Sequence, residues 1–326
     1  MKTLSIVVFL DGRPGHEKQT MGILQVLSAI TPLEVIDKKV VGISASITAK
    51  NWINYLLTAF LPFTGQKNKY PVDIIIGTGT HTHIPMLLFK RACKSTGMAG
   101  PKIVTCMTPD PLLLNKIDLC CVPQHDTPVP GNNIFVTWGP PNNVTFSTKH
   151  EPDKGLVLLG GVDSKSHDWD NQSIVRKIRK IIQKDPAMSW TISSSPRTPD
   201  DTCQLLDNLT EEMEKVSFFR SAETPTGWVE DQYALNSIVW VTGDSMSMIY
   251  ESLTAGCSVG ILPVKWKQQP NKFQKSIDRL VENKMVIEYE KWQSGAELPA
   301  HTQEPLNESR RCTEEILRRW WPDRLP

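Results

Sequence analysis

The sequence predicts an α/β protein of two halves, each built on a parallel β-sheet. Short, almost continuous apolar runs such as residues 4–10 are typical of strands that are buried on both faces of a parallel sheet. Segments with helical periodicity separate these runs, and the pattern restarts after a stretch containing Pro and Asn at 138–152. The 326 residues suit about two domains. We therefore expect one domain over 1–140, a second over 153–305, and a binding cleft between them.

The individual elements follow from the same patterns in chain order. In the first half, the sequence predicts strands at 4–10, 33–37, 72–76, 102–107, 117–122 and 134–137, and helices at 17–29, at 51–61 and up to about Lys94. In the second half, it predicts strands at 155–159, 188–193, 216–219, 238–241, 259–262 and 285–287, and helices at 171–183, 200–215, 230–236, 246–255, 267–283 and 308–321.

Composition narrows the class of protein. The hydrophobic share of 40% and the charged share of 22% are ordinary for a soluble globular enzyme. The seven cysteines are scattered without a C-x-x-C pair, which favours a reduced, cytoplasmic chain and offers no zinc spacing. No apolar run reaches 18 residues, so we expect no transmembrane helix. We also expect no metal, no other cofactor and no nucleic-acid partner.

The net charge of +1 conceals a difference between the halves. Residues 1–150 carry 14 Lys and Arg against 8 Asp and Glu, whereas residues 151–326 carry 22 against 27. A basic first half favours an anionic ligand or an anionic membrane surface. Ordinary solvated surface charge is the alternative.

The helix predicted at 51–61 is unusually rich in large apolar side chains. It contains Trp52, Ile53, Tyr55, Leu56, Leu57, Phe60 and Leu61, is followed by Pro62 and Phe63, and is flanked by Lys50, Lys67 and Lys69. This pattern fits a segment that dips into a membrane surface or holds a lipid acceptor. A helix of the protein core is the alternative.

Two Gly-containing loops of the first half are expected to face one crevice, because both follow parallel strands. The first loop supplies Asp11, Gly12, Arg13, Gly15 and His16, and the second supplies Gly77, Thr78, Gly79 and Thr80. His16 is a candidate acid or base, with a capping histidine as the alternative. Asp110 follows another strand and is a second candidate base, although its position in a turn favours a turn-capping role. His81 and His83 point to different helix faces, so we expect no metal pair.

The stretch 241–264 predicts a strand, a turn, a helix and a second strand. The turn and first helical residues are Gly243, Asp244, Ser245, Met246 and Ser247. Backbone N–H groups at such a helix start suit a phosphate. Glu251 is expected on the polar side of the helix, where its carboxylate could accept the two hydroxyls of a ribose. A packed unit with a surface Glu is the alternative.

Two further loops of the second half are candidates for holding a diphosphate. The loop after 155–159 contains Gly160, Gly161, Ser164 and Lys165, a composition that can wrap a diphosphate. The loop after 188–193 contains Ser195 and Arg197, whose guanidinium could clamp a phosphate. For the first loop, a bare turn is the alternative.

Four motifs of the chain resemble the plant mitochondrial-fission ELM family and its bacterial relatives. They are Asp-Gly-Arg-Pro-Gly-His-Glu-Lys-Gln at 11–19, Gly-Gly…Lys…His…Trp at 160–169, Ser-x-Arg-Thr-Pro at 195–199 and Val-Thr-Gly-Asp-Ser-x-Ser-Met at 241–248. One departure concerns the third motif. The family tends to have two adjacent Arg before Thr-Pro, whereas Pro196 stands at the first position here, which weakens a two-Arg phosphate clamp.

The segments 11–16 and 241–264 are also similar to those of GT-B glycosyltransferases, particularly the enzyme that makes the lipid-linked peptidoglycan disaccharide. Glu251 falls where that enzyme places its ribose-binding Glu. The resemblance implies a GT-B-like fold of two Rossmann-like domains whose parallel sheets face each other across a cleft. It also implies that the C-terminal helix at 306–326 packs back on the first domain.

These observations together predict a glycosyltransferase that moves a sugar from a nucleotide-sugar donor to an envelope or lipid-linked acceptor. The donor would be held by Ser164, Lys165, Arg197, Ser245 and Glu251, and the acceptor proton would pass to His16 or Asp110. The protein would be cytoplasmic, with peripheral contact to the inner face of the membrane. The alternatives are an adaptor that kept the fold without the chemistry, and an epimerase or hydrolase of a nucleotide sugar.

Overall fold

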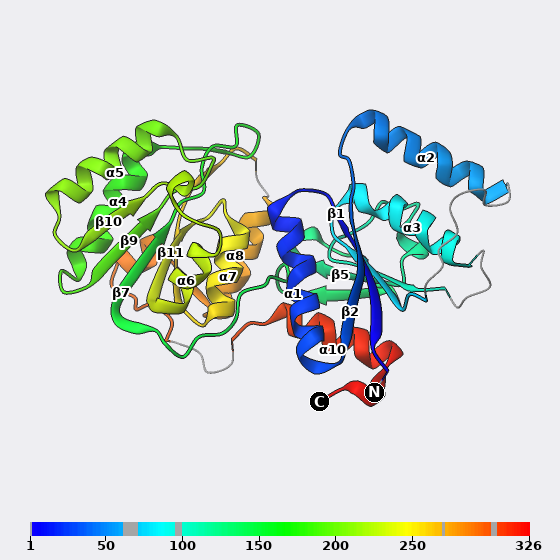
Figure 1. Ribbon diagram of the computed structural model, residues 1–326. Helices are drawn as coiled ribbons and strands as arrows, with labels where there is room; N and C mark the ends of the chain where they lie inside the picture. Colours follow the sequence, from blue (N-terminus) through cyan, green and yellow to red (C-terminus); the bar gives the residue numbers. More distant parts are fainter. Residues whose placement is uncertain (1, 61–70, 95–99, 269–270, 301–304) are drawn as a thin grey trace. The chain divides into compact units, whose positions relative to one another are not determined.

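The computed structural model describes residues 2–60, 71–94, 100–268, 271–300 and 305–326, without the side chains of 58–60. The chain divides into two compact units. Unit 1 comprises Met1–Asn143 and Asn307–Pro326, and unit 2 comprises Val144–Leu306. Each unit contains a parallel sheet with helices on both faces, which confirms the predicted α/β class (Figure 1).

The sheet of unit 1 has the strand order β2-β1-β3-β4-β5-β6. Its strands are β1 (Leu4–Leu10), β2 (Leu33–Val40), β3 (Ile74–Gly77), β4 (Lys102–Thr105), β5 (Leu119–Pro123) and β6 (Ile134–Thr137). Its helices are α1 (Pro14–Ile30), α2 (Ala45–Phe60), α3 (Thr80–Lys94) and α10 (Glu308–Trp320), with 3-10 turns at Leu114–Lys116, Gln124–Asp126 and Pro322–Arg324.

Two hydrophobic cores lie on the two faces of this sheet. On one face, α1 and α10 pack together and bury Ile23, Leu27 and Ile316 against the strands (Figure 1). On the other face, α3 buries Ile84 and Leu87, and α2 packs on α3. Successive residues of a strand point to opposite faces, so a strand covered on both sides must be apolar throughout. This explains the continuous apolar run of β1.

The main sheet of unit 2 has the strand order β10-β9-β7-β11-β12-β14. Its strands are β7 (Glu151–Leu158), β9 (Ser189–Ser193), β10 (Val216–Phe219), β11 (Asn236–Thr242), β12 (Ser258–Leu262) and β14 (Val286–Glu288), and β8 (His167–Asp168) pairs separately with β13 (Lys265–Trp266). Its helices are α4 (Asn171–Lys184), α5 (Asp200–Glu212), α6 (Trp228–Leu235), α7 (Met246–Ala255), α8 (Lys272–Glu282) and α9 (Tyr289–Gln293), with a 3-10 turn at Ser221–Glu223.

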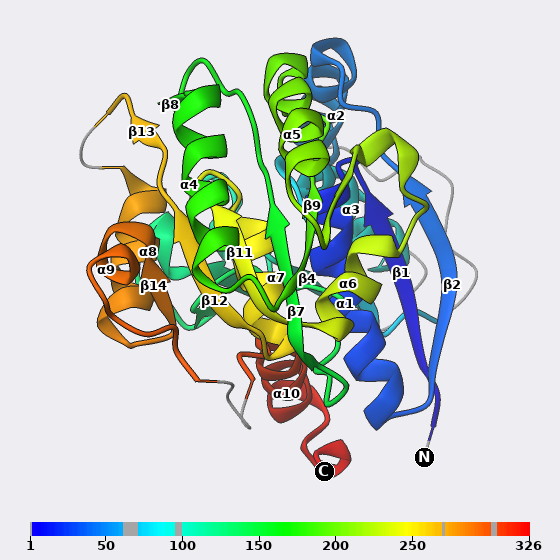
Figure 2. The same ribbon diagram turned by 90° about the vertical axis from the view of Figure 1, so that its left-hand side faces the viewer.

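Helices α4, α5 and α9 cover one face of the unit 2 sheet. Figure 2 shows α4 and α5 running side by side over it. Their apolar stripes, including Ile178 of α4 and Leu206 of α5, join Trp190 and Trp240 of the strands in one buried core. Helices α6 and α7 both contact β11, and α7 also contacts β12.

Each sheet has one point at which the strand order reverses. In unit 1 the chain leaves β1 for β2 on one side and later returns to β3 on the other, so the reversal lies between β1 and β3. In unit 2 the reversal lies between β7 and β11. Loops that follow the two strands at such a point diverge, and the space between them is where open α/β sheets bind ligands.

Several element boundaries differ from the sequence prediction for local reasons. Helix α1 begins at Pro14 rather than at residue 17, because proline favours the first helical turn, so His16 lies inside the helix. Helix α2 begins at Ala45 rather than at 51, because the Ser44 hydroxyl accepts a hydrogen bond from the Ile47 N–H at 3.3 Å. Strand β7 begins at Glu151, inside the stretch predicted as a linker, because it pairs with β11.

The start of α8 was also predicted too early. The helix begins at Lys272 rather than at residue 267, since the Asn271 side chain caps it by accepting from the Phe273 N–H at 2.8 Å. Strand β13 (Lys265–Trp266) ends just before the predicted start of this helix. Sequence periodicity does not reveal a two-residue antiparallel pairing of this kind.

All seven cysteines are buried and none is in a disulfide. In the described part of the chain, no helix combines the length and apolarity needed to cross a membrane.

The packing of α10 on α1 provides a test of the unit 1 fold. A Cβ at Gly22 of α1 would overlap the Asn142 carbonyl, which accepts a hydrogen bond from Ser309 of α10 at 2.6 Å. Alanine normally stabilises a helix by about 1 kcal/mol relative to glycine. We expect Gly22→Ala instead to destabilise unit 1 by about 1–3 kcal/mol, because the backbone contact must open.

Urea unfolding of unit 1 would measure this change. The matched control is Gly131→Ala, where the new methyl group would meet its nearest neighbour, Ile134, at an ordinary 3.4 Å. A stabilised Gly22→Ala protein would contradict the described contact of α1, Asn142 and α10.

Candidate functional site

In unit 1, Asp11 and His16 form a buried acid–base pair at the carboxyl end of β1. The Nδ1 atom of His16 lies 2.7 Å from Oδ2 of Asp11, whose side chain is fully buried, whereas that of His16 is 25% exposed. A carboxylate accepts, so the hydrogen-bond network assigns the ring proton to Nδ1. Nε2 is then left as a proton acceptor, which is the arrangement of an oriented general base.

The second Gly-containing loop closes around this pair. Gly79, which follows β3, has a left-handed φ of +110°, and a Cβ there would overlap the Asp11 carboxylate and the His16 ring. The Thr78 hydroxyl lies 3.0 Å from the Thr20 hydroxyl of α1, which ties the loop to the helix. The structure therefore brings the two predicted loops together at the reversal between β1 and β3.

His83 interacts electrostatically with both His16 and Asp110. His83 of α3 is buried, its Nε2 is 3.2 Å from the Thr105 hydroxyl, and burial lowers its pKa to about 4, with a smaller opposing effect of Asp110. Asp110 itself caps a turn, because its Oδ1 accepts from the Leu112 N–H at 2.9 Å. Of the two candidate bases, only His16 has a dedicated orienting carboxylate among the described residues.

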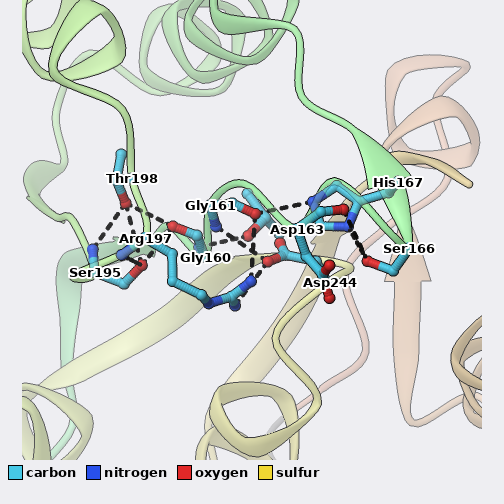
Figure 3. A network of polar contacts seen from close by, with 10 residues as sticks. Gly160, Gly161, Asp163, Ser166, His167, Ser195, Arg197, Thr198 and Asp244 are labelled. Carbon is cyan, nitrogen blue, oxygen red and sulfur yellow. Dashed lines mark hydrogen bonds and ion pairs between the residues drawn. The ribbon is translucent and has the colours of Figure 1, made fainter.

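In unit 2, Asp244 joins the loops that follow three strands (Figure 3). Its side chain is 2% exposed, and its Oδ2 accepts from the Gly161 N–H at 3.0 Å and from Arg197 Nη2 at 2.9 Å. The other carboxylate oxygen, Oδ1, has no partner among the described residues. Gly161 follows β7, Arg197 follows β9 and Asp244 follows β11, so one carboxylate fixes all three loops.

The backbone N–H and carbonyl groups of the Gly160–Gly161 turn are hydrogen-bonded within the protein. The Gly160 N–H donates to the Thr242 hydroxyl at 2.7 Å, and the Gly160 carbonyl accepts from the hydroxyls of Ser195 at 2.5 Å and Thr198 at 2.6 Å. The Gly161 N–H is used by Asp244. These amides were predicted to wrap a diphosphate, but in this structure they hold the loops to one another.

His167 completes the same network from β8. Its Nε2 lies 2.9 Å from the Gly161 carbonyl, so that nitrogen carries the proton, and its Nδ1 accepts from the Ser166 hydroxyl at 2.7 Å (Figure 3). The ring is buried and lies edge-to-face with Trp266 of β13. Thus β13 and β8 position the histidine that supports the Gly160–Gly161 turn.

Glu251 does not lie where the sequence placed it. It was predicted on the polar side of its helix, yet it is buried, and its Oε2 accepts from the Tyr233 hydroxyl of α6 at 3.2 Å. Helix α6 covers this side of α7, and the periodicity of α7 alone does not reveal that cover.

The remaining predicted residues lie around these two centres. In unit 1, Gly12 and Arg13 are exposed, Gly15 is half-buried in the first turn of α1, Gly77 ends β3 buried, and Thr80 starts α3 exposed. In unit 2, Ser164 and Lys165 are exposed, Gly243, Ser245 and Met246 are buried, and Ser247 is exposed near the start of α7.

Sequence reasoning assigned no role to several residues that the structure places in these centres. They are Thr20, His83, His167, Thr198 and Thr242. His167, Thr198 and Thr242 fall inside the family motifs, and that was the only signal available for them. Within the described residues, no group of three His, Cys, Asp or Glu side chains is placed to bind a metal.

The family model described as "Mitochondrial fission ELM1" matches residues 14–320. A search of curated proteins found no match.

Solved structures with similar folds cover nearly the whole chain. A Listeria monocytogenes protein described as a UDP-N-acetylglucosamine 2-epimerase is 13% identical, with a TM-score of 0.53, over 99% of this chain and 90% of its own. A glycosyltransferase from Rickettsia africae is 13% identical, with a TM-score of 0.52, over 98% and 99%. The UDP-GlcNAc 2-epimerase of Methanocaldococcus jannaschii is 12% identical, with a TM-score of 0.50, over 97% and 100%. These likenesses show that the chain has a GT-B fold.

The lowered pKa of His83 predicts a pH dependence of unit 1 stability. An unfolded histidine binds its proton near pH 6.5, but folded His83 does so only near 4. Between these values the unfolded state binds more protons, so stability is lost as the pH falls from 6.5 to 4. We expect a loss of about 3 kcal/mol from this group, which His83→Gln removes.

Hydrogen exchange of the β1 and β3 amides at several pH values would measure the loss. His81→Gln, on the same helix but at a half-buried position, is the control and should keep the wild-type slope. Parallel pH profiles for the wild type and His83→Gln would refute the role assigned to His83.

Proposed function

This chain belongs to the mitochondrial fission ELM1 family, and we propose that it is a glycosyltransferase that uses a nucleotide-activated sugar. One observation carries the proposal. A buried aspartate orients a part-exposed histidine at the strand reversal of unit 1, where an open α/β sheet binds its ligand. A histidine with only a capping role would not need a dedicated buried carboxylate on its ring nitrogen.

In the proposed reaction, His16 acts on the acceptor hydroxyl. Its Nε2 takes the hydroxyl proton while the oxygen bonds to the anomeric carbon of the donor sugar. The bond from that carbon to the diphosphate breaks, and the nucleoside diphosphate leaves with the electron pair. Asp11 stabilises the imidazolium that forms, and Gly79 leaves the space in which the two side chains meet.

The donor is assigned to the loops at the strand reversal of unit 2. Because the amides of Gly160 and Gly161 are occupied, the diphosphate would contact Arg197, Ser247 and the amino end of α7. The Arg197 side chain is 44% exposed and uses two of its five N–H directions on Asp244 and Gly161, so donors remain for a phosphate. Ser164 and Lys165 are exposed on the neighbouring loop, whereas Glu251 is buried beneath α6 and is not placed to accept the ribose hydroxyls.

A panel of UDP, CMP, GDP, ADP and dTDP tests the donor site. A ligand at 100 times its Kd should add about 2.7 kcal/mol to the stability of the folded chain. We expect one nucleotide to raise the melting temperature clearly, with UDP tested first because the similar Methanocaldococcus jannaschii structure contains UDP. Arg197→Gln should weaken that nucleotide's binding about tenfold or more, since it removes the exposed guanidinium donors that are proposed to bind the diphosphate.

His16→Asn separates binding from chemistry in the same assay. It should leave the nucleotide response unchanged and abolish turnover of the matching nucleotide sugar. If the protein binds a nucleotide and hydrolyses or epimerises the donor without transferring the sugar, the alternative of a nucleotide-sugar hydrolase or epimerase would be favoured. A folded protein that responds to no nucleotide would favour an adaptor.

We further propose that the acceptor is held at a membrane surface by α2. Ile53, Leu56 and Leu57 lie on one side of this helix, and each is more than half exposed. Tyr55 faces the protein, where Arg91 of α3 contacts its ring at 4.0 Å. Tyr55 and Trp52 thus pack on the unit 1 core, as a core helix requires, whereas Ile53, Leu56 and Leu57 lie outside it. Phe60, Leu61, Pro62, Phe63, Lys67 and Lys69 of the predicted segment lie outside the described side chains.

Exposed Lys50 lies one turn before the apolar side chains, which suits an anionic bilayer. We expect the chain to bind vesicles containing phosphatidylglycerol, and the pair Ile53→Ser and Leu57→Ser to lower binding roughly tenfold or more. Cosedimentation would measure it. Val129→Ser, an exposed apolar residue elsewhere in unit 1, is the control. Equal binding of the α2 double variant would exclude this surface.

A further inference from the structure

The unit 2 sheet has a cavity of about 250 Å³ at its other edge, and three tryptophans line it. Helix α4 runs against the strand direction, so its last residues lie near the amino ends of the strands, away from the loops of the proposed donor site. The lining residues are Ile181, Lys184, Asp185, Met188, Trp190, Ile238, Trp240, Trp292 and Leu298.

Two glycines in the strands let the indoles lie on the sheet. Gly155 of β7 pairs in register with Trp190 of β9, and a Cβ there would overlap the Trp190 ring. Gly260 of β12 pairs with Trp240 of β11, and a Cβ there would overlap the Trp240 ring. Glycine inside a strand costs stability and marks a place where another group must approach closely. Here it makes an aromatic floor under the cavity.

A cationic side chain, that of Lys184, lies over the third tryptophan, Trp292. The Trp292 ring lies edge-to-face with that of Trp240 at 5.1 Å between centroids. The ammonium of Lys184 lies 4.2 Å from the Trp292 ring centroid and donates a long hydrogen bond of 3.5 Å to the Trp292 carbonyl. The nearby Asp185 is engaged in a turn, where its Oδ1 accepts from the Ala187 N–H at 3.2 Å. Lys184 therefore has donors left for an anion.

One polar group of the lining lacks a partner. Trp190 is 3% exposed, and its ring N–H makes no hydrogen bond to the described residues. A buried donor without an acceptor is costly, and a buried indole N–H usually finds one. An acceptor oxygen on a bound molecule would satisfy this group.

We propose that this cavity binds a small aromatic carboxylate, with its ring against the indoles and its carboxylate at Lys184. Aromatic walls favour a flat ring through edge-to-face and offset contacts. The volume exceeds the roughly 150 Å³ of a cavity that holds benzene and falls below the roughly 300 Å³ at which drug-sized pockets begin. One or two rings fit this range. The site is independent of the proposed donor site, since it uses none of the same residues.

Two probes of matched shape test the assignment, 1-naphthoate and the neutral 1-naphthylmethanol. Calorimetric titration of the full chain should show naphthoate binding more tightly. Leu298→Trp, at a half-buried position of the lining, should fill the cavity and abolish binding of both probes. Lys184→Gln should weaken naphthoate about fivefold and leave naphthylmethanol unchanged, since a partly exposed ion pair contributes up to about that factor.

Unchanged melting temperatures of both variants would show that the fold is intact. An unchanged response to the nucleotide panel would show that the opposite edge of the sheet is intact. Val162→Trp, on an exposed loop position, controls for an added indole. Binding that survives Leu298→Trp, equal affinity of the two probes, or no binding of either at millimolar concentration would overturn the proposal.

Discussion

A buried aspartate at the carboxyl edge of each sheet holds that unit's loops in place. Asp11 follows β1, and Asp244 follows β11, so both lie beside the point where the strand order reverses. A carboxylate removed from water is costly unless donors surround it. Asp11 accepts hydrogen bonds from the His16 ring and the Arg13 N–H. Asp244 accepts hydrogen bonds from the Gly161 N–H and the Arg197 guanidinium. The loop positions follow from satisfying these two charges.

The two aspartates differ in their partners, and this difference separates their chemistry. The partner of Asp11 is an imidazole, whose second ring nitrogen is left as a proton acceptor. The partner of Asp244 is a guanidinium, which stays charged and presents donors in a fixed plane. The edge of unit 1 is therefore suited to proton transfer, and the edge of unit 2 to holding an anion. A transferase that uses a diphosphate-activated sugar needs both abilities.

The two edges of the unit 2 sheet differ in the chemistry of the residues that form them. At the carboxyl edge, short polar loops are joined by hydrogen bonds around Asp244. At the amino edge, Gly155 and Gly260 have no side chain, which leaves room for the Trp190 and Trp240 indoles against the strands. Both arrangements leave a buried polar atom without a partner among the described residues, Oδ1 of Asp244 and the ring nitrogen of Trp190.

The sequence by itself determined the α/β class, the alternation of strands and helices, and the loops in which His16, Arg197 and Asp244 fall. Apolar runs, periodicity and turn residues are local signals, and so are the family motifs. It did not determine which loops meet. The contact of Gly79 with Asp11 and His16, the three-loop contact of Asp244, the cover over Glu251 and the cavity at Trp190 were decided only by the tertiary structure. They depend on strand order and on contacts between residues far apart in the chain, which the spacing of residue types does not encode.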